Sequence, residues 1–169
     1  AGIRVRAKDP GSKKDLESSI ADSGLAIRLE SRYDMPAHYN RGMAYRLQGD
    51  LERGILDFTQ AVRLKPDAQN YRERGKTYTL KRDFRNALAD LTKAIQIDNS
   101  AESYDARGAA YAQQGNWQEA LADLTKAIRL RPNAERYIVR ASVYTDMGDS
   151  ERALADYTQA IQLEPQEAE

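Results

Sequence analysis

Charged residues recur in this sequence at a fixed spacing of 33 residues. Four arginines and four aspartates follow it: Arg41, Arg74, Arg107 and Arg140, and Asp57, Asp90, Asp123 and Asp156. A row of guanidinium groups could bind an acidic ligand, because each presents a fork of donors that matches a carboxylate or a phosphate. The same residues could instead form a structural ladder, each arginine pairing with an aspartate of its own or the preceding unit. We favour the ladder, since a ligand site would not need aspartate to recur in step with arginine.

The sequence offers no pattern for catalysis or metal binding. His38 is the only histidine and there is no cysteine, so no His/Cys metal set and no thiol nucleophile can be built. The glycines are spread along the chain rather than gathered in a phosphate-binding loop. His38 falls in register with Tyr71, Tyr104 and Tyr137, which predicts a helix-packing site. We therefore expect no enzymatic activity, no cofactor and no metal.

The composition is that of a soluble protein without a charge bias. Of the 169 residues, 41% are hydrophobic and 31% charged, and 26 basic residues balance 26 acidic ones. A protein that binds nucleic acid usually carries a basic excess, so that class of partner is not expected. No apolar run approaches the roughly 18–20 residues that cross a bilayer, so we expect no membrane insertion, and a cytoplasmic location is our best expectation.

The fixed spacing belongs to a repeat of the whole sequence. The stretch RGAAYAQQGN at 107–116 has counterparts at 41–50, 74–83 and 140–149. Small residues recur at two sets of positions: Gly42, Gly75, Gly108 and Ala141, and Ala61, Ala94, Ala127 and Ala160. They would let two helix backbones approach closely, while tyrosine and leucine fill the space between. A period between roughly 20 and 50 residues is typical of a solenoid.

Each repeat is predicted to form two helices. Good N-cap residues precede both: Asp34, Asp67, Ser100 and Asn133 before the first helix, and Asp50, Asp83, Asn116 and Asp149 before the second. Their side-chain oxygens can accept hydrogen bonds from the N–H groups of the first turn. Proline ends three of the units, and Asn99 takes its place in the second. One helix pair cannot bury its apolar face alone, so the pairs must stack.

The repeats predict a single solenoid domain over residues 13–169. Four units span about 34–66, 67–99, 100–132 and 133–165, and residues 15–29 match residues 50–64, which predicts a half repeat made of a lone second helix. Residues 1–12 show no periodicity and end in Gly-Ser, so we expect a linker or an added expression segment there.

These residues resemble the tetratricopeptide repeat family. Its pattern pairs a first helix carrying Gly and Tyr with a second carrying Ala, a large apolar residue, Ala and then Pro. Here these are Gly108, Tyr111, Ala120, Leu124, Ala127 and Pro132. The resemblance covers about residues 15–165 and implies an all-α fold, a right-handed superhelical solenoid of antiparallel helix pairs. The chain departs from the family in having arginine before the first-helix glycine, where leucine is common.

The resemblance also implies that the first helices line a concave groove that holds a peptide of a partner. Carried over by register, the groove residues are Tyr39, Asn40, Met43 and Arg46 in the first unit, Arg72, Glu73, Lys76 and Thr79 in the second, Asp105, Ala106, Ala109, Ala112 and Gln113 in the third, and Ile138, Val139, Ser142 and Thr145 in the fourth. These positions vary between units while the core positions do not. A solvent-exposed face whose sequence is under no constraint would vary too. We favour binding, because solenoids present extended concave surfaces for this use.

The expected partner is another protein or a peptide. Arg72 and Lys76 stand one helical turn apart, which predicts an acidic group of the partner near the second unit. Ile138 and Val139 are apolar and on the expected inner face, which predicts an apolar anchor near the fourth unit.

Self-association through the solenoid ends is the alternative. An apolar stripe on the last second helix, which includes Leu154, Tyr157 and Ile161, needs cover from a longer chain or from another copy. Residues 1–14 hold five basic residues against one acidic, and residues 133–169 hold eight acidic against three basic. Ends of opposite charge would favour head-to-tail contact.

Overall fold

The computed structural model describes residues 13–29 and 34–163, and within these ranges it is built of α-helices without strands. The helices are α1 (Lys13–Leu29), α2 (Asp34–Leu47), α3 (Leu51–Leu64), α4 (Ala68–Leu80), α5 (Phe84–Asp98), α6 (Ala101–Gln114), α7 (Trp117–Leu130), α8 (Ala134–Asp146) and α9 (Ser150–Leu163). The all-α class predicted from the repeats is confirmed. No helix in the described part of the chain is both long and apolar enough to cross a membrane.

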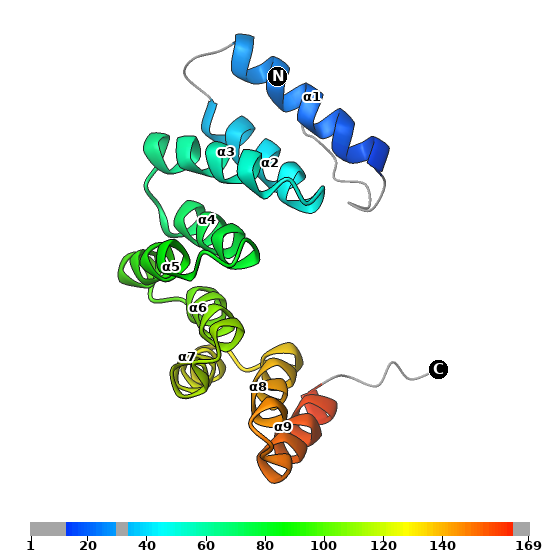
Figure 1. Cartoon of the computed structure of the whole chain (residues 1–169), viewed down its shortest axis with the longest axis vertical. Helices are drawn as coiled ribbons and strands as arrows, with labels where there is room; N and C mark the ends of the chain where they lie inside the picture. Colours follow the sequence, from blue (N-terminus) through cyan, green and yellow to red (C-terminus); the bar gives the residue numbers. More distant parts are fainter. Residues whose placement is uncertain (1–12, 30–33, 164–169) are drawn as a thin grey trace.

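The helices form four pairs that stack in chain order. The pairs are α2 with α3, α4 with α5, α6 with α7, and α8 with α9, and each second helix also contacts the first helix of the next pair. Helix α1 packs on α2. Figure 1 shows the stack as an arc with α3, α5 and α7 on its outer side. The first helices contact one another, α4 with α6 and α6 with α8, so they line the inner side of the solenoid.

Most of the predicted N-caps form. The side chains of six of the eight residues accept a hydrogen bond from the backbone N–H three positions later, those of Asp50, Asp67, Asp83, Ser100, Asn133 and Asp149. Two expectations were wrong in detail. Asp34 is the first residue of α2 rather than the residue before it, and the Asn116 side chain donates to Gln114 instead of capping α7.

The turn inside each pair requires a left-handed residue at one register position. Gly49, Gly115 and Gly148 adopt φ between 78° and 86° there, and the second unit uses Arg82 at φ 63°. Glycine carries no Cβ penalty in this conformation, so Arg82 is strained where the other units are not. Asn99, which replaces the proline between units, is also left-handed at φ 46°, a conformation that proline cannot adopt.

The core repeats with the sequence. Phe58, Leu91 and Leu124 occupy one register position and are fully buried between helix pairs. Tyr157 takes this position on α9 and remains 38% exposed, because no described helix follows α9. In the first three pairs the glycine of the first helix, Gly42, Gly75 or Gly108, lies directly against this large side chain, so the two helices pack closely at that point.

Gly75→Ala is expected to destabilise the protein. The added methyl group would lie 2.7 Å from Leu91 Cγ and 2.9 Å from its Cδ2, closer than carbon atoms can approach. We expect the free energy of unfolding in urea to fall by about 1–2 kcal/mol, an overpacking cost partly offset by the better helix propensity of alanine.

Gly24→Ala is the matched control. Its nearest neighbour is Arg41 Nη1 at 3.6 Å, an ordinary contact, so this variant is expected to raise the free energy of unfolding by about 0.5–1 kcal/mol. Changes of the same sign in the two variants would contradict the close-packing argument.

Candidate binding groove

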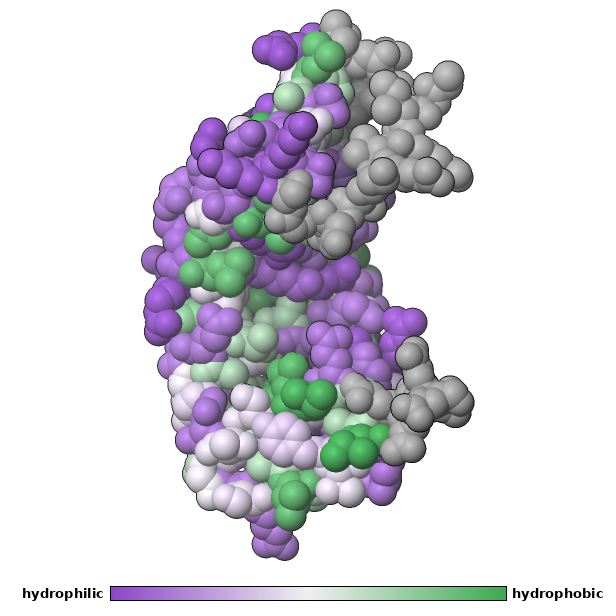
Figure 2. Space-filling view, turned by 90° about the vertical axis from the view of Figure 1, so that its right-hand side faces the viewer, coloured by the Kyte–Doolittle hydropathy of each residue, from purple (hydrophilic) through white to green (hydrophobic). Residues whose placement is uncertain are grey.

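A cavity of about 610 Å³ opens between the first helices α2, α4, α6 and α8. Figure 2 faces the side toward which the arc of Figure 1 opens; hydrophilic residues dominate its upper, N-terminal part and hydrophobic patches gather in its lower part. Eight of the predicted groove residues line the cavity: Arg46, Lys76, Thr79, Asp105, Ala106, Ala109, Gln113 and Val139. The structure therefore brings together predicted residues from all four units.

Six further lining residues were missed by the sequence reasoning, namely Leu80, Glu102, Arg131, Asn133, Glu135 and Arg136. Four of them lie in the first turns of α6 and α8 or just before α8, and Leu80 lies in the last turn of α4, so the cavity extends beyond the expected face at these helix ends. A signal was present in the sequence, because Glu102 and Glu135 are 33 residues apart and belong to the same register position.

Nine predicted residues do not line the cavity: Tyr39, Asn40, Met43, Arg72, Glu73, Ala112, Ile138, Ser142 and Thr145. Tyr39 packs edge-on against Phe58, and its hydroxyl accepts a hydrogen bond from Gln69. Ile138 is 42% exposed, whereas Val139 is half-buried and packs against the cluster around Leu124.

Two cations meet one carboxylate at the α2–α4 end of the cavity. Lys76 Nζ donates to Glu73 Oε1 at 3.0 Å, and Arg46 Nη1 lies 3.1 Å from Glu73 Oε2, an ion pair without hydrogen-bond geometry. The Glu73 side chain is only 9% exposed and does not line the cavity. Positive charge therefore faces the cavity at this end.

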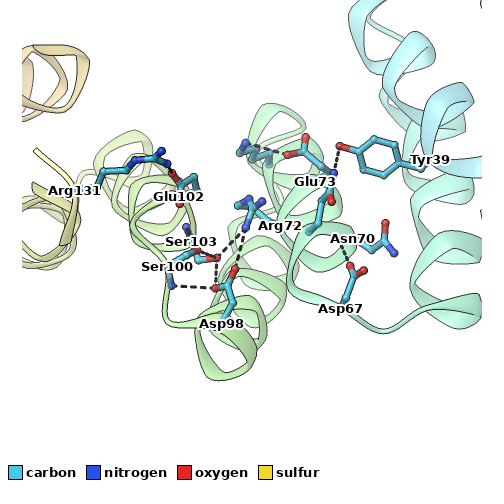
Figure 3. Close-up of polar contacts among 12 residues, drawn as sticks. Tyr39, Asp67, Asn70, Arg72, Glu73, Asp98, Ser100, Glu102, Ser103 and Arg131 are labelled. Carbon is cyan, nitrogen blue, oxygen red and sulfur yellow. Dashed lines mark hydrogen bonds and ion pairs between the residues drawn. The ribbon is translucent and has the colours of Figure 1, made fainter. Parts of the chain in front are cut away.

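Arg72 is held within the stack. Its Nη1 donates to Asp98 at 3.4 Å and to Ser103 at 3.2 Å, and its side chain is 15% exposed (Figure 3). This contact joins α4 to the junction of α5 and α6. Of the two cations predicted to meet an acidic group, Lys76 is the one that lines the cavity.

Carboxylates exceed cations at the α6–α8 end. Arg131 Nη1 donates to Glu102 at 2.9 Å (Figure 3). Arg136 Nη2 also donates to Glu102, at 3.2 Å, and Arg136 Nε donates to Asp105 Oδ2 at 2.7 Å. Asp105 Oδ1 is buried without a hydrogen-bond partner. Burial raises the pKa of Asp105, against the lowering effect of Arg136, and the nearby Glu102 and Glu135 raise it further.

The repeated arginines and aspartates meet within each helix pair. In all four units, Nε and Nη2 of the arginine donate to the two carboxylate oxygens of the aspartate sixteen residues later, at 2.7–2.9 Å; the pairs are Arg41–Asp57, Arg74–Asp90, Arg107–Asp123 and Arg140–Asp156. The aspartates are buried. These bidentate pairs occupy the donors that an acidic ligand would need.

The arginines also link successive units. Their third nitrogen, Nη1, donates to a threonine hydroxyl of the preceding unit at 3.0–3.3 Å, from Arg74 to Thr59, from Arg107 to Thr92 and from Arg140 to Thr125. Hydrogen bonding to the aspartate raises the pKa of all four ladder arginines. The first unit differs, because the residue equivalent to these threonines is Ala26.

His38 belongs to this ladder. Its Nδ1 lies 2.8 Å from Asp57 Oδ1, beside the fork of Arg41. In the other units a tyrosine stands at this position, and its ring lies 5.6–5.9 Å from the arginine carbon Cζ. The helix-packing role predicted for His38 thus comes with a polar contact that its register did not reveal.

Comparisons with known proteins agree with the repeat. Sequence models described as tetratricopeptide repeat match residues 36–68, 68–100, 101–134 and 134–167. No curated protein matches the chain by sequence.

Solved structures share its fold at low sequence identity. MamA (residue 41 to its end) from Desulfovibrio magneticus RS-1 aligns with a TM-score of 0.78 at 20% identity, covering 91% of this chain and 89% of that one. The thermophilic protein TTC0263 from Thermus thermophilus gives 0.78 at 23% identity, over 91% and 86%. YrrB, described as having an unusual peptide-binding site, gives 0.68 at 22% identity, over 91% and 80%.

Arg107→Lys is expected to lower the free energy of unfolding by about 1–2 kcal/mol, although the positive charge is kept. Lysine cannot fork onto both oxygens of Asp123 and reach Thr92 as well, so a buried carboxylate loses hydrogen bonds. Thermal and urea unfolding measure the effect. Arg131→Lys is the control, because Arg131 is 72% exposed and makes a single bond to Glu102; its change is expected to stay within about 0.5 kcal/mol. Equal losses of unfolding free energy in both variants would contradict a contribution of the arginine–aspartate ladder to stability.

Proposed function

The chain belongs to the tetratricopeptide repeat family, and from this premise we propose that it is a protein-interaction scaffold whose concave cavity binds an extended segment of a partner protein. YrrB is described as a peptide-binding protein of this family, and a peptide segment is the class of occupant that we propose here. Tetratricopeptide repeats are typically not enzymes, and no catalytic role is proposed.

One observation carries the proposal: the cavity is lined by side chains that differ from unit to unit, beside positions that repeat. At the position after the close-packed small residue, Lys76 and Ala109 line the cavity, and Met43 and Ser142 stand there in the first and fourth units, whereas the close-packed position itself is glycine or alanine. Packing requires the repetition, and it does not require the variation. A lining that varies along the solenoid can distinguish one partner sequence from another.

The cavity also has the size and chemistry for a side-chain-bearing segment. A volume of about 610 Å³ lies in the range of small-ligand sites. Lys76 keeps donors beyond the one it gives to Glu73, so it can receive an acidic group of the partner. Ala106, Ala109 and Val139 form an apolar floor, and Ile138 adds exposed apolar surface next to it.

Filling the cavity tests this function. Ala109→Trp places a large ring on the cavity floor, and proteins captured by the wild-type chain from a lysate of its source are expected to be lost from the variant. Lys126→Glu is the matched control, because Lys126 is exposed on α7 and does not line the cavity. Capture that survives Ala109→Trp would place binding elsewhere on the protein, provided that circular dichroism shows both variants folded.

Self-association is the second candidate, and the face of α9 supports it. Leu154 and Ile161 are 68% and 69% exposed, while their register equivalents Leu121 and Ile128 on α7 are covered by the next pair. Exposed apolar side chains at helical spacing are a common feature of interfaces. Within the described residues, no helix covers this face.

Leu154→Asp together with Ile161→Asp tests that candidate. If copies associate through α9, sedimentation velocity is expected to show an oligomer for the wild type and a monomer for the double variant. Leu47→Asp is the control, since Leu47 is 51% exposed but lies on α2, far along the arc from α9. A wild-type chain that stays monomeric at high concentration would contradict self-association.

A further inference from the structure

The groove carries opposite charge at its two ends, and this property narrows the partner beyond the function proposed above, on which the inference rests. The α2–α4 end presents Arg46 and Lys76 against the single carboxylate of Glu73. The α6–α8 end presents Glu102, Asp105 and Glu135 against Arg131 and Arg136. One end therefore has an excess of one positive charge and the other an excess of one negative charge.

The positive end is open to a ligand. Glu73 is buried beneath its two cations, which themselves line the cavity. The Lys76 side chain is 40% exposed, and its ammonium has three donors, of which one reaches Glu73. An acidic side chain of a partner can accept the remaining ones.

The negative end keeps carboxylates that a ligand can reach. All three nitrogens of the Arg136 guanidinium are in use, on Asp105, on Glu102 and on the carbonyl of Arg131, and its side chain is 7% exposed. Arg136 therefore cannot turn to a ligand. The Asp105 side chain, by contrast, is 30% exposed, and the exposed Glu135 lines the cavity with it. A cationic side chain of a partner can donate to these carboxylates.

The floor between the two ends is small and apolar. Ala109 on α6 is in register with Lys76 on α4. The third unit therefore has a small side chain where the second has a long one, and this leaves space in the cavity. Packed neighbouring helices lie about 8–10 Å apart, and an extended chain advances about 3.3 Å per residue. The step from Lys76 to Asp105 therefore matches about three residues of an extended segment.

We propose that the partner segment carries an acidic residue and, about three positions away, a basic residue, with small apolar residues between them. The acidic side chain pairs with Lys76 and Arg46, and the basic side chain pairs with Asp105 beside Glu135. The two charges fix which end of the segment lies at α2 and which lies at α8. Neutral small residues between them rest on Ala106 and Ala109.

A displayed library of random twelve-residue peptides, sorted for binding to the fluorescently labelled full chain, tests the proposal. The peptides that bind the wild type but not Ala109→Trp are the groove binders. They are expected to be enriched in one acidic and one basic residue at a constant spacing near three. Groove binders without a recurrent charge pair would overturn this inference while leaving the proposed function intact. A library without any groove binders would contradict both.

Charge-matched variants then test the two contacts separately. Two synthetic peptides are compared: the parent peptide of the enriched sequence, and a version whose basic residue is replaced by alanine. Asp105→Asn is expected to raise the dissociation constant of the parent peptide about tenfold and to leave that of the alanine peptide unchanged. Lys76→Gln is likewise expected to raise the dissociation constant of the parent peptide and to leave unchanged that of a peptide whose acidic residue is replaced by alanine. Glu135→Lys, at an exposed residue of α8, is expected to weaken the parent peptide without loss of stability. Losses that are equal for the parent and the alanine peptides would overturn the assigned contacts.

Discussion

The close contact between the two helices of a pair, at the small residue of the first helix, is the constraint on which the rest of the structure depends. A Cβ at Gly75 or Gly108 would lie 2.7 or 2.9 Å from the leucine of the second helix, so the backbones are as near as they can come. The contact fixes how far one helix is advanced along the other. Because Arg74 precedes Gly75 and Asp90 precedes Leu91, the same alignment brings guanidinium and carboxylate face to face. A bidentate ion pair requires this alignment, so the arginine–aspartate ladder follows from the packing of the two helices.

Three consecutive residues of α4 serve three separate purposes. Successive residues of an α-helix point about 100° apart. On α4, Arg74 turns to the ladder, Gly75 to the partner helix and Lys76 to the cavity. The first two are fixed by contacts that every unit must make, whereas the third is free to change. Stability and recognition are thereby assigned to neighbouring positions, and a change in the lining leaves the stacking contacts in place.

The features that recur with the period could be predicted from the sequence, and the features that join specific units could not. Register alone located the helix pairs, the buried position of Leu91 and the residues of the ladder. It did not reveal that Arg72 reaches Asp98 on the next helix pair, since one unit has this pair of residues and the others do not. It also missed that the cavity extends to the first turns of α6 and α8 and to the last turn of α4. One exception among the caps, Asn116, carries an amide where its counterparts Asp50, Asp83 and Asp149 carry a carboxylate, and this amide donates to Gln114.

One buried position shows how a solenoid can acquire specificity without losing its fold. Asn70, Ser103 and Arg136 are in register, each nearly fully buried in the first turn of its helix. Asn70 donates to the carbonyl of Lys65 and Arg136 to the carbonyl of Arg131, so both tie the preceding link to the helix. Ser103 performs a related task by donating to Asp98. Only arginine is long enough to hold the link and still reach Asp105 and Glu102 in the groove. The side chain at one structural position thus contributes a positive charge to one end of the cavity, while α4, α6 and α8 begin at equivalent positions.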